Sequence, residues 1–238
     1  MGRLFLVRHA QASFLSQNYD QLSALGETQA RLLGEYWAQR HVAFDRVCTG
    51  PAYRHRQTAE LVGEAYRKAE CHFPSPSVVD EFDEFQGDAV LSQSLPELLA
   101  NNDRIRELHD TLQNSGAEAK RAAFQRLFQA VISLWVNGEI VPRGVEPWQD
   151  FCARVNRGLS KFLEKARKGE HAAIFTSGGP VSVAVQRALH LSALDALQIA
   201  WMPRNCSFSE FIFSGDRFTL SSFNSFPHLD GEPFLTYR

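Results

Sequence analysis

The sequence predicts an α/β protein with a mostly parallel central sheet, and two similar stretches carry this prediction. Residues 4–7 are four consecutive apolar residues that run directly into Arg8 and His9. Residues 171–176 contain a second run, Ala-Ala-Ile-Phe-Thr, which is followed by Ser177-Gly178-Gly179-Pro180. Short apolar runs of this kind are typical of strands buried on both faces, as in parallel sheets. Open α/β sheets bind ligands beyond the C-terminal ends of such strands, so both junctions are candidate binding sites.

The elements between these strands follow the same alternation. Ser23 is a predicted N-cap for an amphipathic helix, and Gly26 near its start indicates close packing. Residues 43–48 predict a second short strand, and residues 52–67 predict a second helix. Arg54, in the first turn of that helix, could bind an anion, because a helix N-terminus already favours negative charge.

The composition changes in the middle of the chain, where residues 86–144 are rich in helical patterns and poor in β-branched runs. Residues 95–112 form a helical pattern that is broken at 101–103, and residues 117–136 form a longer amphipathic helix. We interpret this part as a helical cap inserted into a single α/β domain of residues 1–238. Such caps influence the choice of substrate rather than perform the chemistry.

The last third returns to strands and helices. Pro147 opens a predicted helix, and a further helix is expected over residues 181–189, directly after the glycine pair. Residues 205–213 and 217–223 predict a β-hairpin around Ser-Gly-Asp at 214–216.

Bulk properties exclude several classes of function. The 238 residues carry a net charge of −2, which gives no electrostatic reason to expect nucleic acid or an anionic membrane as the main partner. The four cysteines are scattered without a Cys-x-x-Cys pair, so we do not expect a zinc site. Four free thiols fit a reducing compartment, so we expect a cytoplasmic location. We expect neither a signal peptide nor a membrane span, because the apolar runs are too short.

The polar residues at the strand ends suggest phosphate chemistry. Arg8 could hold an anion, and His9 could act as a nucleophile or a base. Residues 80–84 contain four carboxylates, and one that is buried beside an aromatic ring could act as a general acid. The alternative for each of these residues is a solvated side chain, which is the usual situation of charged residues.

Several motifs in the expected order resemble the histidine phosphatase (phosphoglycerate mutase-like) superfamily over nearly the whole chain. The resemblance lies in Leu6-Val7-Arg8-His9-Ala10, in Leu22-Ser23 with Gly26 and Gln29-Ala30, in Pro51 and Arg54 with Gln57-Thr58-Ala59, and in Val79-Asp80-Glu81-Phe82.

This resemblance implies a three-layer α/β/α domain with an inserted cap. It also implies a phosphatase that hydrolyses a small phosphomonoester without a metal or other cofactor. His9 would accept the phosphoryl group, Arg8 and Arg54 would bind phosphate, and Glu81 would donate a proton. Ser13 and the Gly178 amide are further candidates for phosphate contacts.

Two positions depart from the family pattern. Ala10 replaces a glycine, which is a small change, whereas Ser177 replaces a second histidine that holds the transferring phosphoryl group. A hydroxyl can donate a hydrogen bond but cannot carry a positive charge. Losing one such donor typically costs about a hundredfold to a thousandfold in rate. His55 and His228 are the candidate substitutes.

Three functions therefore remain open at the level of sequence. The first is a phosphatase, possessing either full or reduced activity. The second is a domain that binds a phosphorylated ligand without catalysis, and the third, less favoured, is a phosphoglycerate-type mutase, which would have to retain its phosphoenzyme. The sequence predicts neither the natural substrate nor the oligomeric state.

Overall fold

The computed structural model describes residues 1–13 and 20–237, and the chain divides into two compact units. The first unit comprises Met1–Glu84 and Arg154–Arg238, and the second comprises Phe85–Ala153. The second unit is larger than the cap expected at 86–144. Its extension is explained by aromatic packing, because Trp148 lies 5.6 Å from Trp135 and Phe151 lies 5.7 Å from Phe85 between ring centroids.

The first unit is built on a mixed sheet with the order β3-β2-β4-β1-β5-β6. The pairs β1–β4, β4–β2 and β2–β3 are parallel, and the hairpin β5–β6 adds to the edge of β1 in antiparallel fashion. The strands are β1 (Gly2–Arg8), β2 (Arg46–Thr49), β3 (Ser77–Val78), β4 (His171–Thr176), β5 (Phe208–Ser214) and β6 (Arg217–Ser225).

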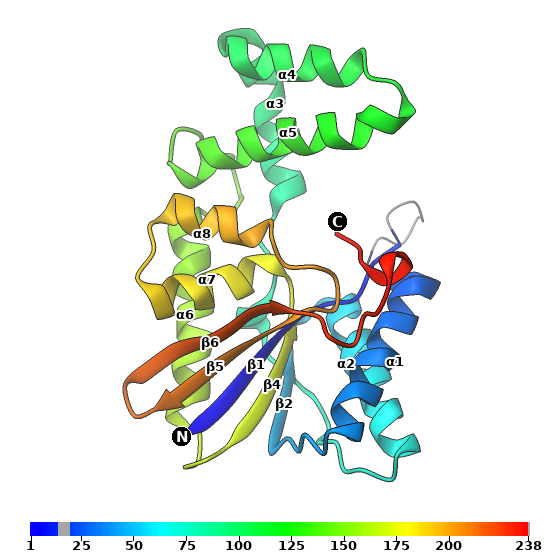
Figure 1. Ribbon diagram of the computed structural model, residues 1–238. Helices are drawn as coiled ribbons and strands as arrows, with labels where there is room; N and C mark the ends of the chain where they lie inside the picture. Colours follow the sequence, from blue (N-terminus) through cyan, green and yellow to red (C-terminus); the bar gives the residue numbers. More distant parts are fainter. Residues whose placement is uncertain (14–19, 238) are drawn as a thin grey trace. The chain divides into compact units, whose positions relative to one another are not determined.

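Helices cover both faces of this sheet (Figure 1), as the predicted three-layer α/β/α fold requires. On one face α1 (Ala24–Gln39) and α2 (Tyr53–Lys68) pack on Phe5 and Val7 of β1. Leu4 and Leu6 alternate with these residues along the strand and are almost fully buried on the opposite face. That face carries α6 (Trp148–Glu164), α7 (Gly178–Leu189) and α8 (Ala193–Ala200).

The second unit contains α3 (Gly87–Asn101), α4 (Asp103–Gln113) and α5 (Ala117–Val136). The expected break at 101–103 is present, because the Asn102 side chain accepts a hydrogen bond from the Ile105 amide and caps α4. The expected helix over 117–136 has the same bounds in the structure.

Two local predictions for α1 are also confirmed. The Ser23 side chain accepts a hydrogen bond from the Gly26 amide, as an N-cap does. A Cβ at Gly26 would lie 2.1 Å from the Gln11 carbonyl oxygen, so only glycine fits this approach. Within the described parts of the chain, every helix is too short or too polar to span a bilayer.

The register of the parallel strands determines where the polar junctions lie. Arg8 pairs with Thr176, and Thr49 pairs with Phe175, so β1, β2 and β4 end at the same edge of the sheet. The residues that follow them, His9, Gly50 and Ser177, are therefore neighbours at this edge.

Candidate functional site

His9 lies at the centre of this edge, directly after β1, with 7% of its surface exposed. Its Nδ1 is 2.8 Å from the Ala10 carbonyl oxygen, which can only accept a hydrogen bond. The Nδ1 position therefore carries the proton, and in the neutral ring the lone pair lies on Nε2. Burial, followed by the charges of Arg54 and Arg8, lowers the pKa of His9 well below 6.5, so the neutral ring is favoured.

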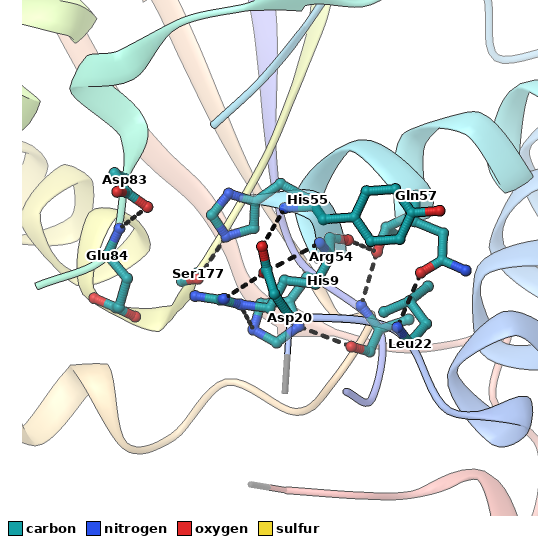
Figure 2. A network of polar contacts seen from close by, with 12 residues as sticks. His9, Asp20, Leu22, Arg54, His55, Gln57, Asp83, Glu84 and Ser177 are labelled. Carbon is teal, nitrogen blue, oxygen red and sulfur yellow. Dashed lines mark hydrogen bonds and ion pairs between the residues drawn. The ribbon is translucent and has the colours of Figure 1, made fainter. Parts of the chain in front are cut away.

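Arg54 points from the first turn of α2 toward this lone pair, as Figure 2 shows. Its Nε donates to His9 Nε2 at 3.3 Å, and its Nη1 donates to Asp20 Oδ1 at 2.8 Å. Asp20 also accepts from the backbone amide of Tyr53, so its carboxylate caps the N-terminus of α2 and fixes the guanidinium. Thr58 secures the helix to the strand end by accepting from the Ala10 amide at 3.1 Å.

Arg8 and Gly178 also lie at this edge. The Arg8 guanidinium donates to the Pro203 carbonyl, and its charge is one of those that lower the pKa of His9. Gly178 begins α7, three residues earlier than predicted, and a Cβ there would lie 2.7 Å from the Ala200 carbonyl oxygen. The N-terminus of α7 thus lies at the site, where its dipole favours an anion, and the Gly179 amide there donates to Glu84.

Ser177 and His55 form a close polar contact in the site. His55 Nε2 and Ser177 Oγ are 2.6 Å apart, and both residues are buried, with exposures of 0% and 1%. The His55 ring centroid lies 5.6 Å from that of His9. Arg54 and His55 are successive residues, yet both reach the site. They can do so because the N-terminal end of α2, and not one side of the helix, faces the ends of the strands.

The carboxylate that reaches the site is that of Glu84, not that of Glu81. Glu84 Oε2 accepts a hydrogen bond from the Gly179 amide at 3.1 Å, next to Ser177. Glu81 instead pairs with Lys161 of α6 at 2.7 Å, and this contact lowers the pKa of Glu81. A general acid needs a carboxyl group that is protonated near neutral pH, so the Lys161 pair works against the role expected for Glu81.

The backbone of the 80–84 segment is held in place from two sides. Arg154 Nη1 on α6 donates to the carbonyl oxygens of Glu81 and Asp83 at 3.0 and 3.2 Å. Thr176 Oγ1, at the end of β4, donates to the Phe82 carbonyl oxygen at 2.6 Å. These contacts place Phe82 in the core and turn Glu84 toward α7.

Two other candidates lie elsewhere in the first unit. The Ser13 amide donates to the Gln21 carbonyl at 2.8 Å, and a phosphate contact by Ser13 stays a prediction. His228 packs between Tyr36 and Phe208, with ring centroids 6.1 and 6.2 Å away, and does not join the polar network of His9. Among the described residues, no group of three His, Cys, Asp or Glu side chains is arranged to hold a metal ion.

Sequence reasoning did not single out Asp20 and Arg154, and it left Glu84 as one of four candidate carboxylates in residues 80–84. A signal for Glu84 was present, because it lies between Phe82 and Phe85, which are both buried. Arg154 and Asp20 carried no signal of this kind, since each acts on a segment that is distant in the sequence.

Comparisons with known proteins agree with this geometry. The family model "Histidine phosphatase superfamily (branch 1)" matches residues 4–131 and, in an overlapping second match, residues 102–225. A comparison with curated proteins found no significant match.

Solved structures share the fold at low sequence identity. The alpha-ribazole phosphatase from Shigella flexneri is 19% identical, with a TM-score of 0.62 over 94% of this chain and 96% of that one. A mycobacterial glucosyl-3-phosphoglycerate phosphatase is 18% identical, with a TM-score of 0.60 over 94% and 99%. A phosphoserine phosphatase mutant from Entamoeba histolytica in complex with phosphoserine is 15% identical, with a TM-score of 0.64 over 96% and 100%.

The order of the motifs, the shared edge that holds His9 and Arg54, and the family match over residues 4–225 have one explanation: this chain belongs to branch 1 of the histidine phosphatase superfamily.

Proposed function

We propose that this protein is a phosphatase that hydrolyses a small phosphomonoester through a phosphohistidine on His9. The observation that carries the proposal is the pair of contacts made by the two ring nitrogens of His9. Its Nδ1–H is bound to the Ala10 carbonyl, and its Nε2 faces the Arg54 guanidinium. A neutral imidazole with its lone pair directed at an anion-binding arginine is arranged to attack a phosphorus atom.

In the first step, His9 Nε2 would form a bond to phosphorus while the bond from phosphorus to the ester oxygen breaks. Arg54, Arg8 and the Gly178 amide would stabilise the charge on the phosphoryl oxygens. Glu84, in place of Glu81 and in its protonated form, would give its proton to the leaving oxygen, which departs as an alcohol.

In the second step, a water molecule would attack the phosphorus of phospho-His9. The Glu84 carboxylate would take a proton from this water, and the P–N bond would break to release inorganic phosphate and neutral His9. The route uses only side chains and backbone amides, so no metal enters it. The four free cysteines fit a reducing compartment, and we place the protein in the cytoplasm.

The names of the three similar structures described above support a phosphatase, because all three are called phosphatases. Hydrolysis of a chromogenic aryl phosphate by the native protein and by His9→Ala tests the proposal. We expect phosphate release by the native protein and background rates for His9→Ala. If no generic monoester were hydrolysed above the His9→Ala background, the proposal would be abandoned.

Ser177 favours a second candidate, a domain that binds a phosphorylated ligand without turning it over. This candidate predicts that inorganic phosphate or vanadate binds with the same affinity to the native protein and to a His9 variant of similar shape, such as His9→Asn. Appearance of an acid-labile phosphate on His9 would exclude it.

A further inference from the structure

The departure at Ser177 has a counterpart on the neighbouring helix. Family resemblance expects an imidazole at the end of β4, where this chain has a hydroxyl. The structure places an imidazole at the same spot from α2 instead, because His55 Nε2 lies 2.6 Å from Ser177 Oγ. The ring is accommodated by Gly50, where a Cβ would lie 2.5 Å from His55 Nδ1.

The direction of the hydrogen bond follows from the surroundings of the ring. His55 Nδ1 is buried and has no hydrogen-bond partner among the described residues. A buried N–H without an acceptor is rarer and costlier than an unused lone pair, so the proton belongs on Nε2. His55 then donates to Ser177 Oγ, and the Ser177 hydroxyl keeps its own proton for another acceptor.

The Ser177 hydroxyl is not used to cap its own helix. Ser177 is the N-cap residue of α7, yet its side chain accepts no hydrogen bond from the helix amides. Ser177 follows β4 at the edge of the sheet where His9 lies, so its hydroxyl proton can be donated to an anion bound there. The pair therefore presents one hydrogen-bond donor to a phosphoryl oxygen.

The His55 ring is held in the neutral form. Burial, followed by the Arg54 charge, lowers the pKa of His55 well below 6.5. The buried Nδ1 has no acceptor for a second proton among the described residues, so the ring acts on Ser177 as a neutral donor.

We infer that His55 is a positioning residue which, through Ser177, takes the place of the second histidine of the family and directs a hydrogen-bond donor at the transferring phosphoryl group. This inference rests on the proposed function. It assigns a role to the one imidazole in the site that does not form the phosphoenzyme.

A reciprocal exchange tests the inference. The proteins are the native chain, His55→Ala, Ser177→Ala, the double alanine variant, Ser177→His, and Ser177→His combined with His55→Ala. Each is assayed with an aryl phosphate for kcat and KM. We expect His55→Ala and Ser177→Ala to lower kcat by about a hundredfold each. The double alanine variant should be no more than a few-fold worse than either, because the two residues act as a unit.

The exchange itself is the decisive comparison. Ser177→His in the His55→Ala background restores an imidazole from β4 and should regain at least about tenfold in kcat. Ser177→His alone should give no gain, since His55 already fills the space next to position 177. The inference would be overturned if the losses in kcat multiplied in the double alanine variant and if Ser177→His in the His55→Ala background regained no kcat. A residue that only packs would not be rescued from another helix.

Two further measurements keep the test independent of folding and of turnover. Thermal unfolding identifies any variant that fails to fold, and His55→Leu, which fills the buried space without an N–H, then replaces His55→Ala in the cycle. The affinity for inorganic phosphate is measured on the same proteins. If the native protein hydrolyses nothing, the proposed function fails, whereas phosphate affinity that falls in the single variants and returns in the exchange still supports the pair. Unchanged affinity throughout would contradict it.

Discussion

Among single residues, the proposed proton donor differs most between sequence and structure, because the resemblance implies Glu81 and we propose Glu84. Four carboxylates lie in residues 80–84, and the fold gives them different partners. Glu81 faces Lys161, whereas Glu84 reaches the Gly179 amide at the start of α7. The choice of acid is therefore made by which way the backbone turns after Phe82, not by the local composition.

We predict that Glu84→Gln lowers kcat on an alkyl phosphate by about a hundredfold to ten-thousandfold, because an alkoxide leaves poorly without a proton. The loss on an aryl phosphate should be smaller, since a phenolate leaves more readily. Glu81→Gln is the matched control and should change kcat less than about threefold, as it removes only an ion pair at the surface. Steady-state kinetics on both substrates measure the difference. Equal losses on the two leaving groups, or a larger effect of Glu81→Gln, would contradict the assignment.

At the level of elements, α6 holds the segment that carries Glu84. Arg154 lies on this helix and donates to backbone carbonyls on both sides of Phe82. Its guanidinium therefore sets the path of the backbone rather than contacting the substrate. Gly158, one turn later, lets the segment approach, since a Cβ there would lie 2.7 Å from the Cβ of Glu81.

We expect Arg154→Ala to reproduce the leaving-group pattern of Glu84→Gln in weaker form, with a loss of about tenfold or more in kcat on an alkyl phosphate. The control is Arg157→Ala, which removes an exposed arginine from the same helix. Urea unfolding of both variants separates misplacement of Glu84 from general destabilisation. If Arg154→Ala lowered alkyl and aryl turnover equally, the helix would not act through the acid.

At the scale of the whole first unit, burial favours the neutral form of three histidines. Burial lowers the pKa of His9 and His55 well below 6.5 and lowers that of His228 to about 4. The unfolded chain binds protons at these sites first as the pH falls below 6.5. The free energy of unfolding must therefore decrease on acidification, by about 1.4 kcal/mol per pH unit for each such histidine.

One substitution tests how much His228 contributes to this loss of stability at acidic pH. His228→Phe keeps a ring against Phe208 and removes a titrating group, so the slope of unfolding free energy against pH should flatten by about one proton between about pH 6 and about pH 5. His72→Asn, a change at an exposed histidine, serves as the control. Urea unfolding at several pH values gives both slopes. An unchanged slope in His228→Phe would mean that this histidine is protonated in the native state.

The fold was accessible from the sequence because its signals are local. The apolar runs at 4–7 and 171–176, the Ser23 cap and the helix at 117–136 each depend on neighbouring residues. The two-residue β3 and the eight-residue α8 were not predicted, since elements this short carry little periodicity. The Ser177–His55 contact joins positions 122 residues apart, so only the folded chain could reveal it.

The phosphohistidine on His9 is the central claim, and rapid-quench trapping tests it most directly. The native protein is mixed with a radiolabelled aryl phosphate, quenched in base, which preserves phosphohistidine, and analysed by peptide mapping. We predict label on the peptide that contains His9, with acid lability and with formation at least as fast as turnover. The label should be absent in His9→Ala. Phosphate release without any label, or turnover retained in His9→Ala, would contradict the account.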